Sequence, residues 1–374
     1  MRSQTLVMDE SGDIDVRTVD VPDIGNDELL VHIELTGICG SDIHMREGGL
    51  DLDFPVVPGH ELAGVVEAVG ENVTTDSAGN RIEPGDGVTV VPGINVVDDW
   101  YTNHVPAHPL ACTERKVYGF RDVEDEPHVH GGMSQYFLIE KDAHFFRLPD
   151  HLDVELGALV EPLAVATHAL DLSYQPGVPW IREGFGIGQS VVVQGAGPIG
   201  MLTAAAANHA GAGQVISVDL VDERLDLAAQ FGATHTVNVS DYEDDTFIDA
   251  INEMTPSGEG PDIVIEAVGH PNAFEQAIDI SRKAGTVVEV GHYAYNGEAE
   301  VDPSQLIHKE LSIRGSLAYP PTQFETAISL LDQTSENLPF RKLFNHRVGL
   351  DEAESAYEAQ AAGEAYRATV HPNL

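Results

Sequence analysis

The ten residues Val191–Gly200, VVVQGAGPIG, join a short apolar run to a glycine-rich turn. Val191–Gln194 has the length and composition of a buried strand. An alanine-rich segment, Ile199–Ala212, follows and predicts a helix, and Val215–Asp219 predicts a second strand. A strand, a turn, a helix and another strand at this spacing are typical of a parallel sheet with crossover helices. The stretch therefore predicts an α/β fold.

The three glycines of this turn also favour a binding site for a dinucleotide. Gly195 permits a tight turn, Gly197 lets the backbone approach a pyrophosphate, and Gly200 lets the helix pack against the strand. Pro198 and Ile199 open the helix, whose first N–H groups favour an anion. Glycines also mark ordinary turns, but the strand before them and the helix after them favour a dinucleotide site.

An acidic residue follows at the expected distance. Asp219 lies 24 residues after Gly195, where it can accept hydrogen bonds from the ribose hydroxyls and repel a 2′-phosphate. This favours NAD over NADP. Arg224 could stack on the adenine or pair with an acid on the helix surface. Val268 and Val290 end two later predicted strands, and we expect them to border the nicotinamide.

The rest of the chain divides into two patterns. Alternating strands and helices continue the parallel sheet, whereas the first third is rich in strands and turns. The sheet pattern continues with a helix at Glu223–Gly232 and strands at Asp262–Val268 and Thr286–Val290. The first third contains predicted strands at Leu29–Leu35, Gly64–Gly70 and Val88–Val91, and the first of these alternates like a half-buried strand. The end of the chain contains a predicted helix at Gln323–Asp332 and a predicted strand at Arg367–His371.

A chain of 374 residues is too long for one compact core. We expect a mostly-β domain over residues 1–165, completed by residues 320–374. A doubly wound parallel-sheet domain should occupy residues 166–319.

A set of metal-ligating residue types lies in the first half. Cys39 and His60 are 21 positions apart, and Glu161 can add a carboxylate. A thiolate, an imidazole and a carboxylate are ligands that Zn²⁺ prefers, and a catalytic zinc takes three of them and keeps one position open. We expect these three residues to bind one zinc ion. Glu61 could replace one ligand or bind the water on the metal.

Neighbouring polar residues suggest how this metal site is supported. Asp42 is the expected acceptor for the other ring nitrogen of His60, which would fix its tautomer. Ser41 and His44 follow Cys39 closely enough to form a proton relay. His44 could equally be a surface histidine.

The other histidines and the second cysteine give weaker indications of a metal site. His104, His108, His128 and His130 lie in an irregular segment, residues 93–131, without regular ligand spacing, and are a weak candidate for a second metal site. The two cysteines, Cys39 and Cys112, do not form a disulfide framework.

The charge is strongly acidic, with 19 basic residues against 62 acidic residues and a net charge of −43. Such a surface repels itself in dilute buffer, and high salt removes that cost. The pattern is typical of a salt-adapted protein, although an ordinary acidic enzyme remains the alternative. Nucleic acids and anionic membranes need basic patches, so neither is an expected partner. No apolar run is long enough for a membrane span, and no signal peptide is evident, so we expect a cytoplasmic protein.

Taken with their order, these motifs resemble the zinc-dependent medium-chain dehydrogenases of the alcohol dehydrogenase superfamily. The segment Gly157–Val165 resembles the branch of sorbitol, butanediol and threonine dehydrogenases, in which a glutamate is a zinc ligand. That family often carries a four-cysteine structural zinc near the position of residues 93–120, where this chain has only Cys112, so we expect no structural zinc. The matching segments are Gly37–His44, Gly59–Glu61, Gly85–Asp86, Gly131–Tyr136, Gly195–Gly200 and Asp219.

The resemblance implies a GroES-like catalytic domain, a Rossmann domain and NAD-linked oxidation of an alcohol or polyol. It also implies a homodimer or homotetramer that pairs through an edge strand at Glu310–Leu317. An aldose 1-dehydrogenase on the same scaffold is the alternative enzyme. A non-enzymatic NAD sensor or a zinc-free quinone reductase is a further alternative, and the joint presence of Cys39, His60 and Glu161 argues against both.

Overall fold

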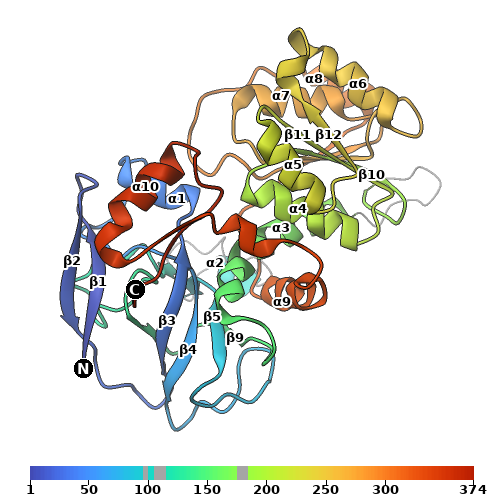
Figure 1. Cartoon of the computed structure of the whole chain (residues 1–374). Helices are drawn as coiled ribbons and strands as arrows, with labels where there is room; N and C mark the ends of the chain where they lie inside the picture. The colour runs from blue at the N-terminus through green and yellow to red at the C-terminus, as the bar shows by residue number, and fades with distance from the viewer. Residues whose placement is uncertain (96–99, 105–114, 175–183) are drawn as a thin grey trace. The chain divides into compact units, whose positions relative to one another are not determined.

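The computed structural model describes residues 1–95, 100–104, 115–174 and 184–374 (Figure 1). These residues form two compact units. The β unit comprises Met1–Glu161, Pro320–Glu336 and Phe340–Leu374, and the parallel-sheet unit comprises Pro162–Tyr319 and Asn337–Pro339. The boundaries at residues 165/166 and 319/320 for the functional domains remain our prediction.

The parallel-sheet unit is built on six parallel strands in the order β12-β11-β10-β13-β14-β15. The chain moves outward from β10 in one direction and then restarts at β13 on its other side. This is the strand order of a Rossmann fold, in which the carboxyl ends of β10 and β13 flank the ligand crevice. The strands are β10 (Ser190–Gln194), β11 (Gln214–Asp219), β12 (His235–Asn238), β13 (Ile263–Glu266), β14 (Thr286–Glu289) and β15 (Ser312–Gly315).

Buried apolar strands hold this unit together. Val192, Ile216, Val264 and Val287 are fully buried and belong to one core, as expected for a parallel sheet covered by helices. The helices are α3 (Val160–Ser173), which starts in the β unit, α4 (Pro198–His209), α5 (Asp222–Gln230), α6 (Phe247–Met254), α7 (Pro271–Ile280) and α8 (Pro303–Lys309), with 3-10 turns η3 (Val239–Asp241) and η4 (Asp244–Thr246).

The β unit contains a seven-stranded sheet in the order β16-β17-β3-β4-β5-β9, with β8 also paired to β3. In Figure 1, β3, β4, β5 and β9 lie side by side in this sheet. Two smaller pairs, β1-β2 and β6-β7, complete the strands described. The strands are β1 (Arg2–Met8), β2 (Ile14–Asp20), β3 (Leu29–Gly37), β4 (Glu61–Val69), β5 (Gly87–Val90), β6 (Gly93–Asn95), β7 (Arg115–Val117), β8 (Tyr136–Ile139), β9 (Phe145–Arg147), β16 (His346–Val348) and β17 (Ala368–Val370).

Short helices complete the β unit, and α1 packs against α10. The C-terminal segment is integral to it, because β17 pairs with β3 at Thr369 and Val370. The helices are α1 (Gly40–Arg46), α2 (Trp100–His104), α9 (Gln323–Thr334) and α10 (Ala353–Ala361), with 3-10 turns η2 (Val154–Leu159), η5 (Phe340–Leu343) and η6 (Leu350–Glu352).

The burial of β3 follows the predicted alternation over Val31–Leu35, where His32 and Glu34 reach solvent and the residues between and beside them are buried. Leu30 departs from this alternation, because it is buried as well. Leu29, Val31 and Ile33 pack into one core, and Leu30 packs into another with Leu138.

No helix in the described ranges has the length and apolar character that a membrane crossing requires.

Candidate metal centre and dinucleotide turn

The metal centre begins where β3 ends. Cys39 is the N-cap of α1, and its N–H donates to Oδ2 of Asp42 at 2.8 Å. This hydrogen bond fixes the first turn of the helix and holds the cysteine at its amino end. Gly37 is required just before it, because a Cβ there would lie 2.4 Å from Oε2 of Glu61.

Strand pairing brings His60 and Glu61 to the same place. Glu61 is the register partner of Gly37 in the antiparallel pair β3-β4. The ligand atoms of Cys39, His60 and Glu61 all lie within 4.8 Å of one another. His60 and Glu61 are buried, and Cys39 is half-buried. Residues distant in sequence thus form a compact set of sulfur, nitrogen and oxygen donors.

The contacts of His60 orient its ring. Nδ1 lies 3.6 Å from Oδ1 of Asp42, and Nε2 lies 3.3 Å from the Ser41 hydroxyl. Burial alone would lower the pKa of His60, but Asp42 and Cys39 raise it well above the ordinary value. The surroundings of the ring are therefore strongly anionic.

One unsatisfied atom indicates that the site fits a cation. Oε2 of Glu61 is buried and has no hydrogen-bond partner within the described residues. Nδ1 of His60 and Oδ1 of Asp42 face each other 3.6 Å apart, which leaves Nε2 of His60 for a cation. Buried polar atoms without partners are costly, and buried anions need a counter-charge. A thiolate, an imidazole and a carboxylate match the donors of a zinc site.

Sequence reasoning missed Arg367 as part of this centre. Its Nη1 donates to Oε1 of Glu61 at 2.7 Å and to the Ile38 carbonyl at 3.2 Å, and the side chain is buried. Burial lowers the pKa of Arg367, but Glu61, Cys39 and Glu161 raise it above the ordinary value. The only sequence signal was an arginine at the start of the final predicted strand.

Two predicted residues lie nearby without joining the three grouped donors. Glu161 is buried near the start of α3, and its charge acts on Arg367. Its carboxylate is outside the group whose atoms lie within 4.8 Å of one another. His44 is half-buried on α1. Metal binding by Glu161 and a relay through His44 therefore remain predictions.

The glycine turn has the expected form in the parallel-sheet unit. Gly195 has φ +88°, and a Cβ at Gly200 would lie 1.8 Å from the Gly195 carbonyl oxygen. Gly197, the N-cap of α4, has no atom within 4 Å of the position of a Cβ. Pro198 and Ile199 follow as the first residues of that helix. Protein packing requires Gly195 and Gly200, whereas the open space at Gly197 fits the approach of a ligand.

Asp219 ends β11 beside this turn. Oδ2 accepts from the Ala196 N–H at 2.7 Å, and Oδ1 accepts from Leu220 at 2.8 Å and Val221 at 3.0 Å. The carboxylate therefore fixes the glycine turn and still has lone-pair capacity for ribose hydroxyls. Arg224 lies on α5 and is half-buried.

Val268 lies two residues after the carboxyl end of β13, and Val290 directly follows the carboxyl end of β14. Val268 is 52% exposed, which is unusual for valine beside a buried strand, and Val290 is half-buried. Both lie at the sheet edge where a Rossmann fold binds its ligand.

Family comparison agrees with this geometry. Residues 25–150 match the family described as alcohol dehydrogenase GroES-like domain, and residues 198–333 match the family described as zinc-binding dehydrogenase. A D-xylulose reductase of Scheffersomyces stipitis is 34% identical, with 96% of each chain covered. The chain belongs to the zinc-dependent medium-chain alcohol dehydrogenase family.

Two further relatives extend the comparison. A sorbitol dehydrogenase of Bombyx mori is 30% identical, over 98% of this chain and 97% of its own. The crystal structure of an alcohol dehydrogenase from Thermotoga maritima has a TM-score of 0.90 and 26% identity, with 99% of both chains covered. The chain is therefore an oxidoreductase with a GroES-like domain and a Rossmann domain.

Three of the four histidines considered for a second metal site make hydrogen-bond contacts with the backbone. A ring nitrogen of His128 lies 2.7 Å from the Val123 carbonyl, and one of His130 lies 3.0 Å from the Asp122 carbonyl. His104 bonds the Trp100 carbonyl within α2. His108 and Cys112 lie outside the described residues.

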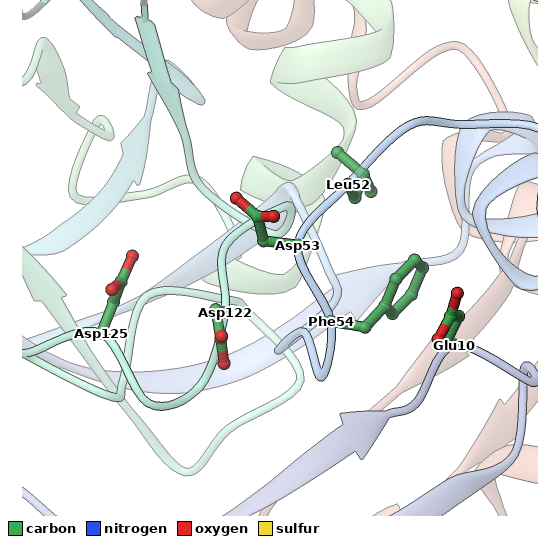
Figure 2. A pocket seen from close by; sticks show the side chains of 6 residues that line it. All are labelled: Glu10, Leu52, Asp53, Phe54, Asp122 and Asp125. Carbon is green, nitrogen blue, oxygen red and sulfur yellow. The ribbon is translucent and has the colours of Figure 1, made fainter.

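A separate acidic pocket of about 390 Å³ occurs in the β unit of this dehydrogenase. Figure 2 shows its lining, which consists of four acidic side chains from three separate segments together with Leu52 and Phe54. None of the predicted site residues lines it. Its acidic lining is Glu10, Asp53, Asp122 and Asp125.

Proposed function

We propose that this dehydrogenase oxidises a polyol or secondary alcohol to the ketone with NAD, using one catalytic zinc ion per chain. Sorbitol is a polyol and D-xylulose is a ketose, so the names of the two relatives describe the two directions of one type of reaction. The alcohol carbon would lose a hydride to the nicotinamide, and the hydroxyl would lose its proton to the solvent.

The convergence of Cys39, His60 and Glu61 is the observation that carries this proposal. Zinc, when bound, supplies Lewis acidity that lowers the pKa of a hydroxyl. We propose Cys39, His60 and Glu161 as its ligands, with Glu61 as the alternative carboxylate. Asp42 faces Nδ1 of His60 and so leaves Nε2 for the metal.

The neighbouring residues would handle the proton. The Ser41 hydroxyl lies 3.3 Å from Nε2 of His60, beside the atom expected to bind the metal. A substrate hydroxyl at that place would meet the serine, which can accept its proton. We propose that His44, on the next turn of α1, passes the proton outward.

The cofactor would occupy the parallel-sheet unit. The open space at Gly197 supports pyrophosphate binding, and the carboxylate of Asp219 supports NAD over NADP. We propose that Arg224 contacts the adenine and that Val268 and Val290 border the nicotinamide.

A metal and substrate assay tests the function. Purified protein should contain about one zinc per chain, and polyols should be oxidised with NAD in molar KCl. The panel should include sorbitol, xylitol, butanediol, threonine and aldoses, since an aldose preference would favour the alternative. Absence of zinc together with absence of any NAD-linked oxidation would refute the proposal.

Assembly and cellular setting are also proposals. β15 lies at the end of the parallel sheet, with one edge paired to β14. An unpaired edge is usually covered, so we propose that two copies pair there in a dimer or tetramer. A monomeric mass by light scattering in molar KCl would contradict this. The acidic composition supports a salt-adapted cytoplasm, and the free thiol of Cys39 suits a reducing compartment.

A further inference from the structure

A row of polar residues lies at the carboxyl end of the parallel sheet. Gln194, Glu266 and Glu289 are the last residues of β10, β13 and β14, and they are register partners. Partnered residues in adjacent strands extend from the same face of the sheet. Strands buried on both faces are usually apolar, so three polar residues in one row need an explanation.

Glu266 holds the loop that follows β13. Its side chain is fully buried, and Oε1 accepts from the N–H groups of Val268 at 2.6 Å and Gly269 at 3.0 Å. Oε2 lies 3.3 Å from the Gly269 nitrogen. The carboxyl group therefore fixes the backbone at Val268, one of the two positions proposed to border the nicotinamide.

Glu289 holds the loop that follows β14 in the same way. Oε1 accepts from the backbone N–H of His292 at 3.1 Å and lies 2.9 Å from Nδ1 of its ring. The same ring nitrogen lies 3.7 Å from Oε2 of Glu266. His292 therefore joins the two carboxyl groups and ties the loop containing Val290 to them.

Acceptors outnumber donors in this row. Oε2 of Glu289 and Oε1 of Gln194 are buried without a hydrogen-bond partner in the described part of the chain. The charged groups that face Glu266 are Glu289 and His292. Burial and the neighbouring Glu289 raise the pKa of Glu266 to about 8. At neutral pH one proton would therefore supply the missing donor.

We propose that Glu266, Glu289 and His292 are positioning residues that share a proton and lock the two loops bordering the nicotinamide ring. The inference rests on the proposed function, because it assumes that NAD binds at this edge of the sheet. Loss of the proton would leave two buried carboxylates side by side, and their repulsion would loosen both loops. Cofactor affinity should then fall at high pH.

The test is NADH binding measured by fluorescence between pH 6 and 10 in molar KCl. The dissociation constant of the unaltered protein should be level below pH 7 and rise above pH 8, by at most tenfold per pH unit for one proton. Glu266→Gln is neutral at every pH and can accept from the loop and donate to Glu289. It should bind within about threefold of the unaltered protein at pH 7 and lose the rise above pH 8.

Matched variants separate this role from a general structural one. Glu253→Gln removes an exposed carboxylate from the same unit, on α6, and should retain the rise. An identical rise in Glu266→Gln would overturn the inference. So would a divalent cation, detected by metal analysis, that binds the unaltered protein and is lost in Glu289→Gln. Failure of the unaltered protein to bind NADH or NADPH at any pH would refute the proposed function itself.

Discussion

At the scale of single residues, the candidate metal centre brings buried polar side chains close together. Glu61 lies in one group with Cys39 and His60, and Arg367 contacts Glu61 directly. Removing one partner of a buried ion pair is strongly destabilising, because the other charge is left buried and uncompensated. The arginine therefore holds the carboxyl group of Glu61 in place whether or not a metal is bound.

Replacing Arg367 should lower the stability of the protein. Arg367→Met leaves the carboxylate of Glu61 buried without a partner, and we expect a loss of about 3–5 kcal/mol of unfolding free energy without zinc. Added zinc should restore part of the loss, because the metal supplies the counter-charge. Thermal unfolding with and without zinc measures both effects, and Arg367→Lys is the control that keeps the charge. Equal stability of the Met variant and the parent would contradict this account.

The ligand assignment predicts that zinc binding and activity are lost together. Cys39→Ala and His60→Ala should each reduce zinc from about one ion per chain to near zero and abolish NAD-linked oxidation, because these two residues supply the sulfur and nitrogen donors of the group found in the described residues. His209→Ala, at an exposed histidine on α4, is the control. Comparing Glu61→Gln with Glu161→Gln by metal analysis identifies the carboxylate ligand. Normal turnover in either of the first two variants would rule out the assignment.

Asp219 should set the cofactor preference. Asp219→Asn keeps an acceptor for the Ala196 N–H but removes the charge that repels a 2′-phosphate. We expect the ratio of kcat/KM for NADP to that for NAD to rise by about tenfold, equivalent to roughly 1.4 kcal/mol of relieved repulsion. Steady-state kinetics with both cofactors measures it. An unchanged ratio would place the preference elsewhere.

At the scale of elements, one of the five lysines caps the C-terminal end of a helix. Nζ of Lys309 donates to the carbonyls of Ile278, Asp279 and Ser281 at 2.8–3.0 Å, at the end of α7. Burial lowers the pKa of this lysine, so the hydrogen bonds and the helix dipole must offset its desolvation.

Lys309→Met should therefore destabilise the parallel-sheet unit by about 1–2 kcal/mol. Lys283→Met removes the same charge from an exposed position and serves as the control. Denaturant unfolding of both variants gives the difference. If the two variants lose equal stability, net charge and not the cap would be responsible.

Strands and helices were predictable where the pattern of apolar residues within one segment is enough to define them. Thr286–Val290 was predicted as a strand, and β14 occupies Thr286–Glu289. The edge position of the strand within Glu310–Leu317 was also correct. The burial of Leu30 was not predictable, because its packing against Leu138 depends on distant pairing.

Residue types and spacing suggested Cys39 and His60, and the structure groups them with Glu61. Arg367 could not be predicted, because its contact with Glu61 joins positions 306 residues apart. Glu266 and Glu289 appear in sequence as the ends of two strands. Only the register of the sheet shows that they lie side by side.

At the scale of the whole molecule, the net charge of −43 dominates. Several of the few cations are already paired, as Arg347 and Arg341 are with Glu155. The pocket of Figure 2 has the same acidic excess locally, because four of its six lining residues are Asp or Glu. Repulsion among so many like charges opposes folding unless mobile cations screen it.

Salt should therefore stabilise the protein strongly. Raising KCl from about 0.1 M to about 1 M shortens the Debye length from roughly 10 Å to roughly 3 Å and removes most repulsion between exposed carboxylates. Each kcal/mol gained should raise Tm by roughly 2–4 °C, so we expect an increase of several degrees by calorimetry. The sorbitol dehydrogenase of Bombyx mori, measured in the same buffers, provides a family member for comparison. A Tm that is constant or falls with KCl would mean that the acidic surface is not an adaptation to salt.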